Sequence, residues 1–187
     1  MRVVGGKWRG RALVAPKGHT TRPTTDRNRE ALFSMLEARL DFEGLRVLDL
    51  FAGTGALGLE ALSRSAAFTL FVETEAKARA AIRNNVEACV AMGVSKIFRR
   101  DATKLGARQG APYDVVFADP PYGKGLAEKA LAALLNGDWL SAEALLVIEE
   151  DKRSGFVAPD GFEEVERRVK GDTELIFLSL MKPDFVR

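Results

Sequence analysis

The strongest constraint on the fold of this chain is a regular alternation of two patterns between residues 45 and 149. Short apolar runs, which are typical of buried strands, occur at 45–50, 69–73, 114–118 and 144–149, and a short strand is also expected near 95–99. Apolar residues with helical spacing separate these runs at 56–64, 75–92 and 125–135. Because strands and helices that alternate in this way form parallel sheets, the sequence predicts an α/β fold with a mainly parallel, doubly wound sheet.

The C-terminal part follows a different pattern. The runs 162–169 and 174–181 are both typical of strands, and Lys170-Gly171-Asp172 between them has the composition of a hairpin turn. Since the two strands of a hairpin run antiparallel, the mainly parallel sheet should carry an antiparallel pair at or near its edge.

The N-terminal part is also distinct from the alternating region. Runs at 2–4 and 11–14 favour β structure and flank a glycine-rich centre, which predicts a β-hairpin. A polar loop follows, and a helix is expected to begin after Thr25, which can serve as its N-cap. We therefore expect a basic N-terminal extension over residues 1–25 and one main domain over residues 26–187.

Composition excludes several classes of protein. The 187 residues are 47% hydrophobic and 29% charged, which is sufficient for one core, and no run approaches the ~20 apolar residues of a membrane span. The first residues lack an apolar signal core, so we expect a cytoplasmic protein. One cysteine, Cys89, and one histidine, His19, leave no disulfide and no expected metal site. The same counts exclude Cys-His and Ser-His-Asp catalysis unless His19 is the base.

Positive charge is concentrated near the N-terminus. Residues 1–29 contain eight Lys and Arg residues against a single acidic residue, a balance of +7, whereas the whole chain carries only +2. Trp8 lies among Lys7, Arg9 and Arg11, and cations beside an aromatic ring suit phosphate contact combined with base stacking. This pattern indicates nucleic-acid binding, and the alternative is a solvated basic tail.

A glycine-rich turn joins the run 45–50 to the helical pattern that follows. The turn contains G-x-G-x-x-G at positions 53–58, and Glu73 ends the next strand 20 residues after Gly53. Such a turn allows close approach to a ligand, and a carboxylate at that position accepts hydrogen bonds from ribose hydroxyls. Nicotinamide dehydrogenases and S-adenosylmethionine enzymes both need these features. Asp49, before the glycines, favours S-adenosylmethionine because a carboxylate attracts its ammonium group and repels a pyrophosphate.

The segment Asp119-Pro120-Pro121-Tyr122 follows the buried strand expected at 114–118. Two prolines cannot continue a central strand, so the backbone must leave the sheet at its C-terminal edge, where α/β folds bind ligands. Asp119 and the Pro120 carbonyl can accept the two hydrogens of an exocyclic amine, and Tyr122 can stack on a flat base. An ordinary Asp-Pro turn is the alternative for this segment alone.

Taken in order along the chain, these residues resemble the RsmD family of bacterial 16S ribosomal RNA guanine-N2 methyltransferases. The resemblance extends from about residue 2 to residue 181. Besides the turn and the Asp-Pro-Pro-Tyr segment, it rests on Gly5-Gly6-Lys7-Trp8-Arg9-Gly10-Arg11, Arg22-Pro23-Thr24-Thr25-Asp26-Arg27 and the segment Gly55 to Arg64.

The resemblance implies a Rossmann-like seven-stranded sheet, S-adenosylmethionine as cofactor, and methylation of one guanine in 16S rRNA. The partner would be this RNA, within a small ribosomal subunit or an assembly intermediate, and the enzyme would be a monomer. The implied cofactor residues are Asp49, Phe51, Gly53, Gly55, Glu73, Asp101 and Ala102. The implied catalytic residues, which hold the flipped base, are Asp119, Pro120, Pro121 and Tyr122. The implied RNA-binding residues are Lys7, Trp8, Arg9, Arg11, Arg22, Thr24 and Arg27.

Three alternative functions use part of the same pattern. A DNA adenine-N6 or cytosine-N4 amino methyltransferase would use the same pocket, but 187 residues leave little room for a target-recognition region. A nicotinamide-dependent dehydrogenase would use the glycine turn and leave residues 119–122 unexplained. A noncatalytic RNA-binding protein would use only the basic N-terminal part.

Overall fold

The computed structural model describes residues 1–15, 25–121 and 124–182. Its seven strands form one mixed sheet in the order β3-β2-β1-β4-β5-β7-β6. The chain divides into two compact units, Met1–Asp101 and Ala102–Arg187. The expected α/β fold, with a mainly parallel sheet that ends in antiparallel strands, is confirmed.

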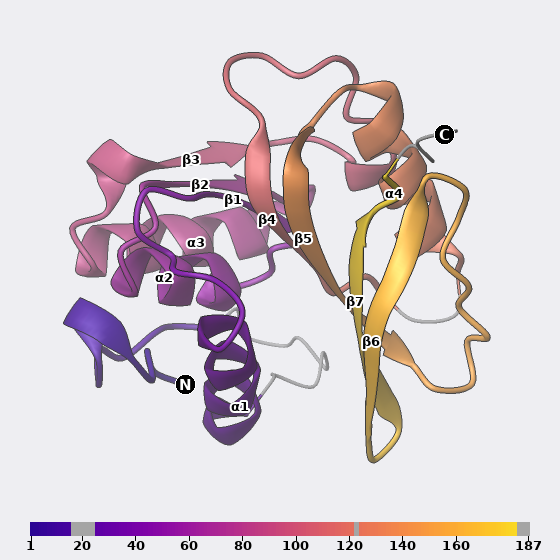
Figure 1. Ribbon diagram of the computed structural model, residues 1–187. Coiled ribbons are helices and arrows are strands. Elements are labelled where there is room, and N and C mark those ends of the chain that lie inside the picture. Colours follow the sequence, from indigo (N-terminus) through magenta and orange to yellow (C-terminus); the bar gives the residue numbers. More distant parts are fainter. Residues whose placement is uncertain (16–24, 122–123, 183–187) are drawn as a thin grey trace. The chain divides into compact units, whose positions relative to one another are not determined.

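The first unit is built on three parallel strands (Figure 1). They are β1 (Arg46–Leu50), β2 (Phe68–Val72) and β3 (Ser95–Phe98). The helices of this unit are α1 (Asp26–Glu37), α2 (Ala56–Ser63) and α3 (Ala76–Ala88), with short 3-10 turns η1 (Gly6–Trp8) and η2 (Met92–Val94). Helices α2 and α3 lie along one face of the three strands. The buried residues of β1 and β2 explain why both sequences appear as continuous apolar runs.

The second unit contains the remaining strands. They are β4 (Tyr113–Ala118), β5 (Leu140–Asp151), β6 (Phe162–Lys170) and β7 (Thr173–Leu180). Strand β5 pairs in parallel with β4 and antiparallel with β7, while β6 and β7 form the expected hairpin. The helix α4 (Leu126–Asn136) and the 3-10 turn η3 (Ala102–Lys104) contact each other.

The N-terminal hairpin is shorter than the sequence predicts. Its two arms meet in a single antiparallel bridge between Arg2 and Ala12, and η1 forms the tip. Backbone bonds from Val3 N–H to the Arg11 carbonyl (2.9 Å) and from Gly10 N–H to the Val3 carbonyl (2.8 Å) hold the arms together. Thr25 caps α1 as expected, and its side chain accepts a hydrogen bond from the Asn28 N–H at 3.2 Å.

Helix α3 ends before the predicted boundary. The helical pattern extends to residue 92, but α3 ends at Ala88, and Val90 adopts a left-handed φ of 53°. Val90 is therefore 79% exposed, while Cys89 next to it is buried. Across the described segments, none of the helices has the length and apolar character needed to cross a membrane.

Candidate active site

The glycine turn connects β1 to α2 as the sequence predicts. Gly55 is the N-cap of α2 and has a φ of 74°, a conformation that L side chains rarely adopt. A Cβ at Gly55 would also lie 3.1 Å from the Phe71 ring. At Gly53 an added Cβ would meet only the Phe51 carbonyl oxygen, at 3.9 Å, so the backbone at this point faces open space. The turn can therefore receive a ligand against its backbone.

Glu73 holds this turn in place. It follows β2, and its Oε2 accepts the Gly53 N–H at 2.9 Å while its Oε1 accepts the Glu75 N–H at 2.8 Å. A carboxylate has about four acceptor sites, so both oxygens keep capacity for a further donor such as a hydroxyl. The residue that the sequence assigns to ribose binding thus also fixes the glycine turn.

Asp49 lies in β1, just before the turn along the chain, and is buried. Its Oδ2 accepts the Gly58 N–H at 3.0 Å, one of the amides in the first turn of α2 that have no partner within the helix. The carboxylate thus stabilises the start of the helix and adds negative charge beside the turn. With Glu73, it makes the surroundings of the turn acidic, which fits a cationic, hydroxyl-bearing cofactor better than a pyrophosphate.

The remaining cofactor residues expected from the resemblance lie near the end of β3. Asp101 follows β3 and is exposed at the end of the first unit. Ala102 is buried and begins η3 in the second unit. Within the described residues, no group of three or more His, Cys, Asp or Glu side chains could hold a metal ion.

The Asp-Pro-Pro segment leaves the sheet at the end of β4, as predicted. Asp119 is partly buried, Pro120 is buried and Pro121 is exposed, whereas Tyr122 lies outside the described residues. Burial, together with the negative charges of Glu149 and Glu150, raises the pKa of Asp119 to about 8. The group therefore changes charge close to neutral pH, as residues that transfer protons do.

The acidic neighbours of Asp119 are the part of the site that the sequence analysis missed. Strand β5 continues past the predicted end at residue 149, and Ala118 pairs with Ile148, which brings Glu149 beside Asp119. Burial, with the nearby charge of Glu128, also raises the pKa of Glu150. Three consecutive acidic residues follow the apolar strand at 149–151. This run is the sequence signal that could have identified the acidic neighbours of Asp119.

The predicted RNA-binding residues lie on the first unit. Lys7, Arg9, Arg11 and Arg27 are exposed, whereas Arg22 and Thr24 lie outside the described residues. The Lys7 ammonium lies 4.5 Å from the centre of the Trp8 ring, which is the expected pairing of a cation with an aromatic face.

The fold, together with the proteins that this chain matches, defines a Rossmann-like α/β methyltransferase. A solved structure titled "Putative methyltransferase yhhF from Escherichia coli" matches with a TM-score of 0.83 and 32% identity, covering 98% of this chain and 99% of that one. The chain belongs to the family described as Conserved hypothetical protein 95, whose model matches residues 1–179. This is the RsmD family to which the motifs point.

Curated relatives agree with this membership. Ribosomal RNA small subunit methyltransferase D of Escherichia coli K12 is 39% identical over 156 residues, which cover 83% of this chain and 77% of the relative. The protein of the same name from Haemophilus influenzae is 33% identical over 174 residues, covering 91% of this chain and 89% of the relative.

Proposed function

We propose that this protein transfers a methyl group from S-adenosylmethionine to the exocyclic N2 amine of a guanine in 16S ribosomal RNA. The observation that carries the proposal is Asp119, which the backbone presents at the end of β4 among acidic side chains. Such surroundings favour a ligand that donates hydrogen bonds, and an exocyclic amine donates two. The names of the relatives supply the substrate class, a small-subunit ribosomal RNA.

The first unit supplies the residues for the cofactor, which carries an electrophilic methyl group on a sulfonium. Gly53 and Gly55 bring backbone close to the ligand, and Phe51 lies beside them in the same turn. Asp49 attracts the ammonium of the cofactor, and Glu73 has acceptor sites left for the ribose hydroxyls. Asp101 and Ala102 are assigned to the cofactor by the family resemblance.

The second unit supplies the residues for the base. Asp119 and the Pro120 carbonyl accept the two amine hydrogens, which fixes the direction of the nitrogen lone pair. Pro121 stiffens the backbone of the turn, and Tyr122 stacks on the base, which offsets part of the few kcal/mol needed to unstack it. The cofactor would supply the methyl group from its sulfonium, and the methylated amine would then have one proton to release. An Asp119 carboxylate with a raised pKa is a better acceptor for that proton than an ordinary aspartate.

The basic residues of the first unit are assigned to the RNA backbone. Lys7, Arg9, Arg11 and Arg27 are exposed and can contact phosphates, with Trp8 available for stacking. The proposed substrate is a small ribosomal subunit or an assembly intermediate, which implies a cytoplasmic location. We propose that the protein acts as a monomer.

The decisive experiment combines binding with product analysis. Calorimetry with S-adenosylmethionine and with NAD should show micromolar binding of the first and none of the second. Tritiated methyl transfer to small ribosomal subunits that lack the modification should yield N2-methylguanosine, identified by mass spectrometry after nuclease digestion. Binding of NAD alone would establish a dehydrogenase, and a methylated adenine or cytosine in DNA would establish the alternative amino methyltransferase.

A further inference from the structure

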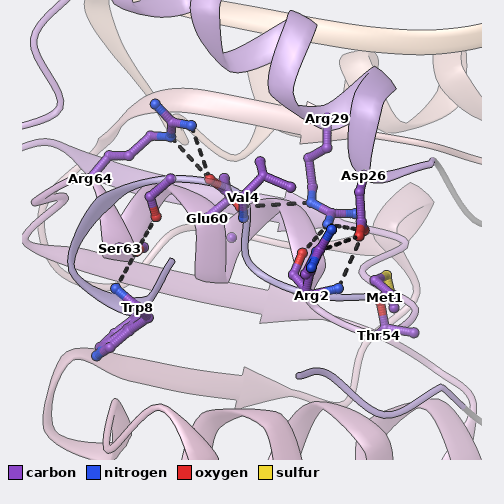
Figure 2. Close-up of polar contacts among 12 residues, drawn as sticks. Met1, Arg2, Val4, Trp8, Asp26, Arg29, Thr54, Glu60, Ser63 and Arg64 are labelled. Carbon is purple, nitrogen blue, oxygen red and sulfur yellow. Dashed lines mark hydrogen bonds and ion pairs between the residues drawn. The ribbon is translucent and has the colours of Figure 1, made fainter. Parts of the chain in front are cut away.

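The basic N-terminal segment, residues 2–14, is fastened to the helix that the glycine turn begins. On α2, Glu60 accepts the Val4 N–H through Oε2 at 2.9 Å, and the Ser63 hydroxyl accepts the Trp8 N–H at 2.9 Å (Figure 2). The same hydroxyl donates to the Gly5 carbonyl at 2.6 Å. Glu60 and Ser63 are both buried, so the α2 side of these contacts is shielded from water. The segment is therefore part of the folded unit and is not a solvated tail in its described part.

A buried arginine of α1 completes this attachment. The Arg29 side chain is 0% exposed, donates to the Arg2 carbonyl and forms an ion pair with Asp26 at 2.8 Å. Its Nε lies 3.7 Å from Glu60, which also pairs with Arg64 at 3.1 Å (Figure 2). The positive charges of Arg29 and Arg64 thus compensate the buried Glu60 carboxylate, which in turn holds the backbone of the segment.

A second attachment leads directly to the glycine turn. Asn85 on α3 is 1% exposed, and its Oδ1 accepts the Val14 N–H at 2.8 Å. Its Nδ2 donates to the Val14 carbonyl at 3.0 Å and to the Thr54 carbonyl at 2.9 Å. Thr54 lies between Gly53 and Gly55, so one buried side chain joins the end of the basic segment to the centre of the turn. The Thr54 hydroxyl also contacts the sulfur of Met1, the residue just before the segment, at 3.9 Å.

We propose that Asn85 is a positioning residue that couples the glycine turn to the basic N-terminal segment, so that cofactor and RNA strengthen each other's binding. A ligand on the turn restricts the motion of the Thr54 carbonyl and so of the Asn85 amide that donates to it. The amide then loses less conformational freedom on holding Val14 than it does in the protein without the ligand. By thermodynamic linkage, RNA that restricts the motion of the segment must raise the affinity for the cofactor by the same factor. This inference rests on the proposed function.

The first test uses the unmodified protein and hydrogen exchange measured by mass spectrometry. Addition of S-adenosylhomocysteine should slow exchange of the amides in residues 2–14 by about 5-fold or more, the lower end of common coupling factors. The affinity for in vitro transcribed 16S rRNA, measured with and without S-adenosylhomocysteine, should rise by a similar factor. If S-adenosylhomocysteine binds and both quantities stay unchanged, the coupling proposal is overturned while the proposed function stands. If S-adenosylhomocysteine does not bind, the proposed function itself fails.

The second test isolates Asn85. Asn85→Asp keeps the shape and the acceptor but removes both N–H donors, so the coupling factor should fall toward one. Asn84→Asp makes the same chemical change at the adjacent exposed position and should keep the coupling of the unmodified protein. A folded Asn85→Asp protein, checked by circular dichroism, with full coupling would contradict the role of this residue. If Asn85→Asp does not fold, the exchange and affinity measurements on the unmodified protein decide the proposal.

Discussion

At the scale of single residues, Asp119 shows how the surroundings of a common side chain change its acid strength. Burial and the charges of Glu149 and Glu150 raise its pKa to about 8. Near neutral pH the free protein therefore holds a proton on this carboxyl group for much of the time. The amine of the substrate meets a group that can accept hydrogen bonds and, once ionised, can take a proton.

Removal of this carboxyl group should nearly abolish methyl transfer. We expect Asp119→Ala to lower the rate by roughly 10²–10³, by analogy with the loss of one well-placed hydrogen-bonding group in other active sites. Affinity for S-adenosylmethionine should change little, because the residues assigned to the cofactor lie mainly in the first unit. Tritiated methyl transfer and calorimetry measure the two quantities. Asp160→Ala, at an exposed position, is the control, and equal rates for both variants would contradict the proposed amine clamp.

The raised pKa of Asp119 also predicts a pH dependence. If the ionised carboxylate is the active form, kcat/KM should rise with pH with a midpoint at about 8 and then level off. Glu149→Gln removes a negative charge that raises the pKa of Asp119, so the midpoint of the profile should move to lower pH. The measurement is the rate of methyl transfer at limiting RNA from pH 6 to about 9.5. A midpoint that moves to higher pH in Glu149→Gln would contradict the claim that the Glu149 charge raises the pKa of Asp119.

At the scale of elements, α2 supports both the glycine turn and the basic N-terminal segment. Its start is the glycine turn, where Asp49 bonds to the Gly58 N–H. Its last turns carry Glu60 and Ser63, which hold the basic segment. Eight residues of one helix thus support both the proposed cofactor contact and the proposed RNA contact.

A substitution at the start of α2 should therefore affect binding of the cofactor. Gly55→Ala places a Cβ at a φ of 74° and 3.1 Å from Phe71, and a left-handed L residue costs roughly 1–2 kcal/mol. We expect the free energy of unfolding to fall by about this amount and S-adenosylmethionine to bind less tightly. Gly93→Ala serves as the control, because a Cβ there would meet nothing within 4 Å. Denaturant titration and calorimetry test the prediction, which fails if Gly55→Ala matches Gly93→Ala in both.

At the scale of the whole molecule, the distribution of charge matters more than its sum. The chain carries a formal net charge of +2, but eight Lys and Arg residues fall within the first 29 positions. Because residues 2–14 of this region are attached to α2, the basic side chains among them extend from a fixed backbone.

Reversal of one of these charges should weaken RNA binding in a salt-dependent way. Arg9→Glu should lower the affinity for 16S rRNA. It should also reduce the magnitude of the slope of log K against log[salt] by roughly 0.7–0.9, the contribution of one phosphate contact. Lys170→Glu reverses an exposed charge in the hairpin of the second unit and is the matched control. Filter binding at several salt concentrations measures both slopes. Equal slopes for Arg9→Glu and Lys170→Glu would show that the segment makes no specific phosphate contact.

The sequence by itself determined the class of fold and the positions of the main motifs. Alternating apolar runs and helical spacing are local patterns, so β1, α2, β4 and the C-terminal hairpin lie close to their predicted ranges. The glycine turn and the departure of the chain at Pro120 follow from backbone chemistry that any reader of the sequence can recognise.

Only the tertiary structure decided which distant residues meet. Arg29, Glu60 and Asn85 give no functional signal in the sequence, yet their partners in the basic N-terminal segment lie 27 to 71 positions away along the chain. In the same way, the pKa of Asp119 depends on Glu149 and Glu150, which parallel pairing of β4 with β5 brings close. Hydrogen bonding and charge interaction act over a few ångströms of space, and the path of the folded chain sets those distances.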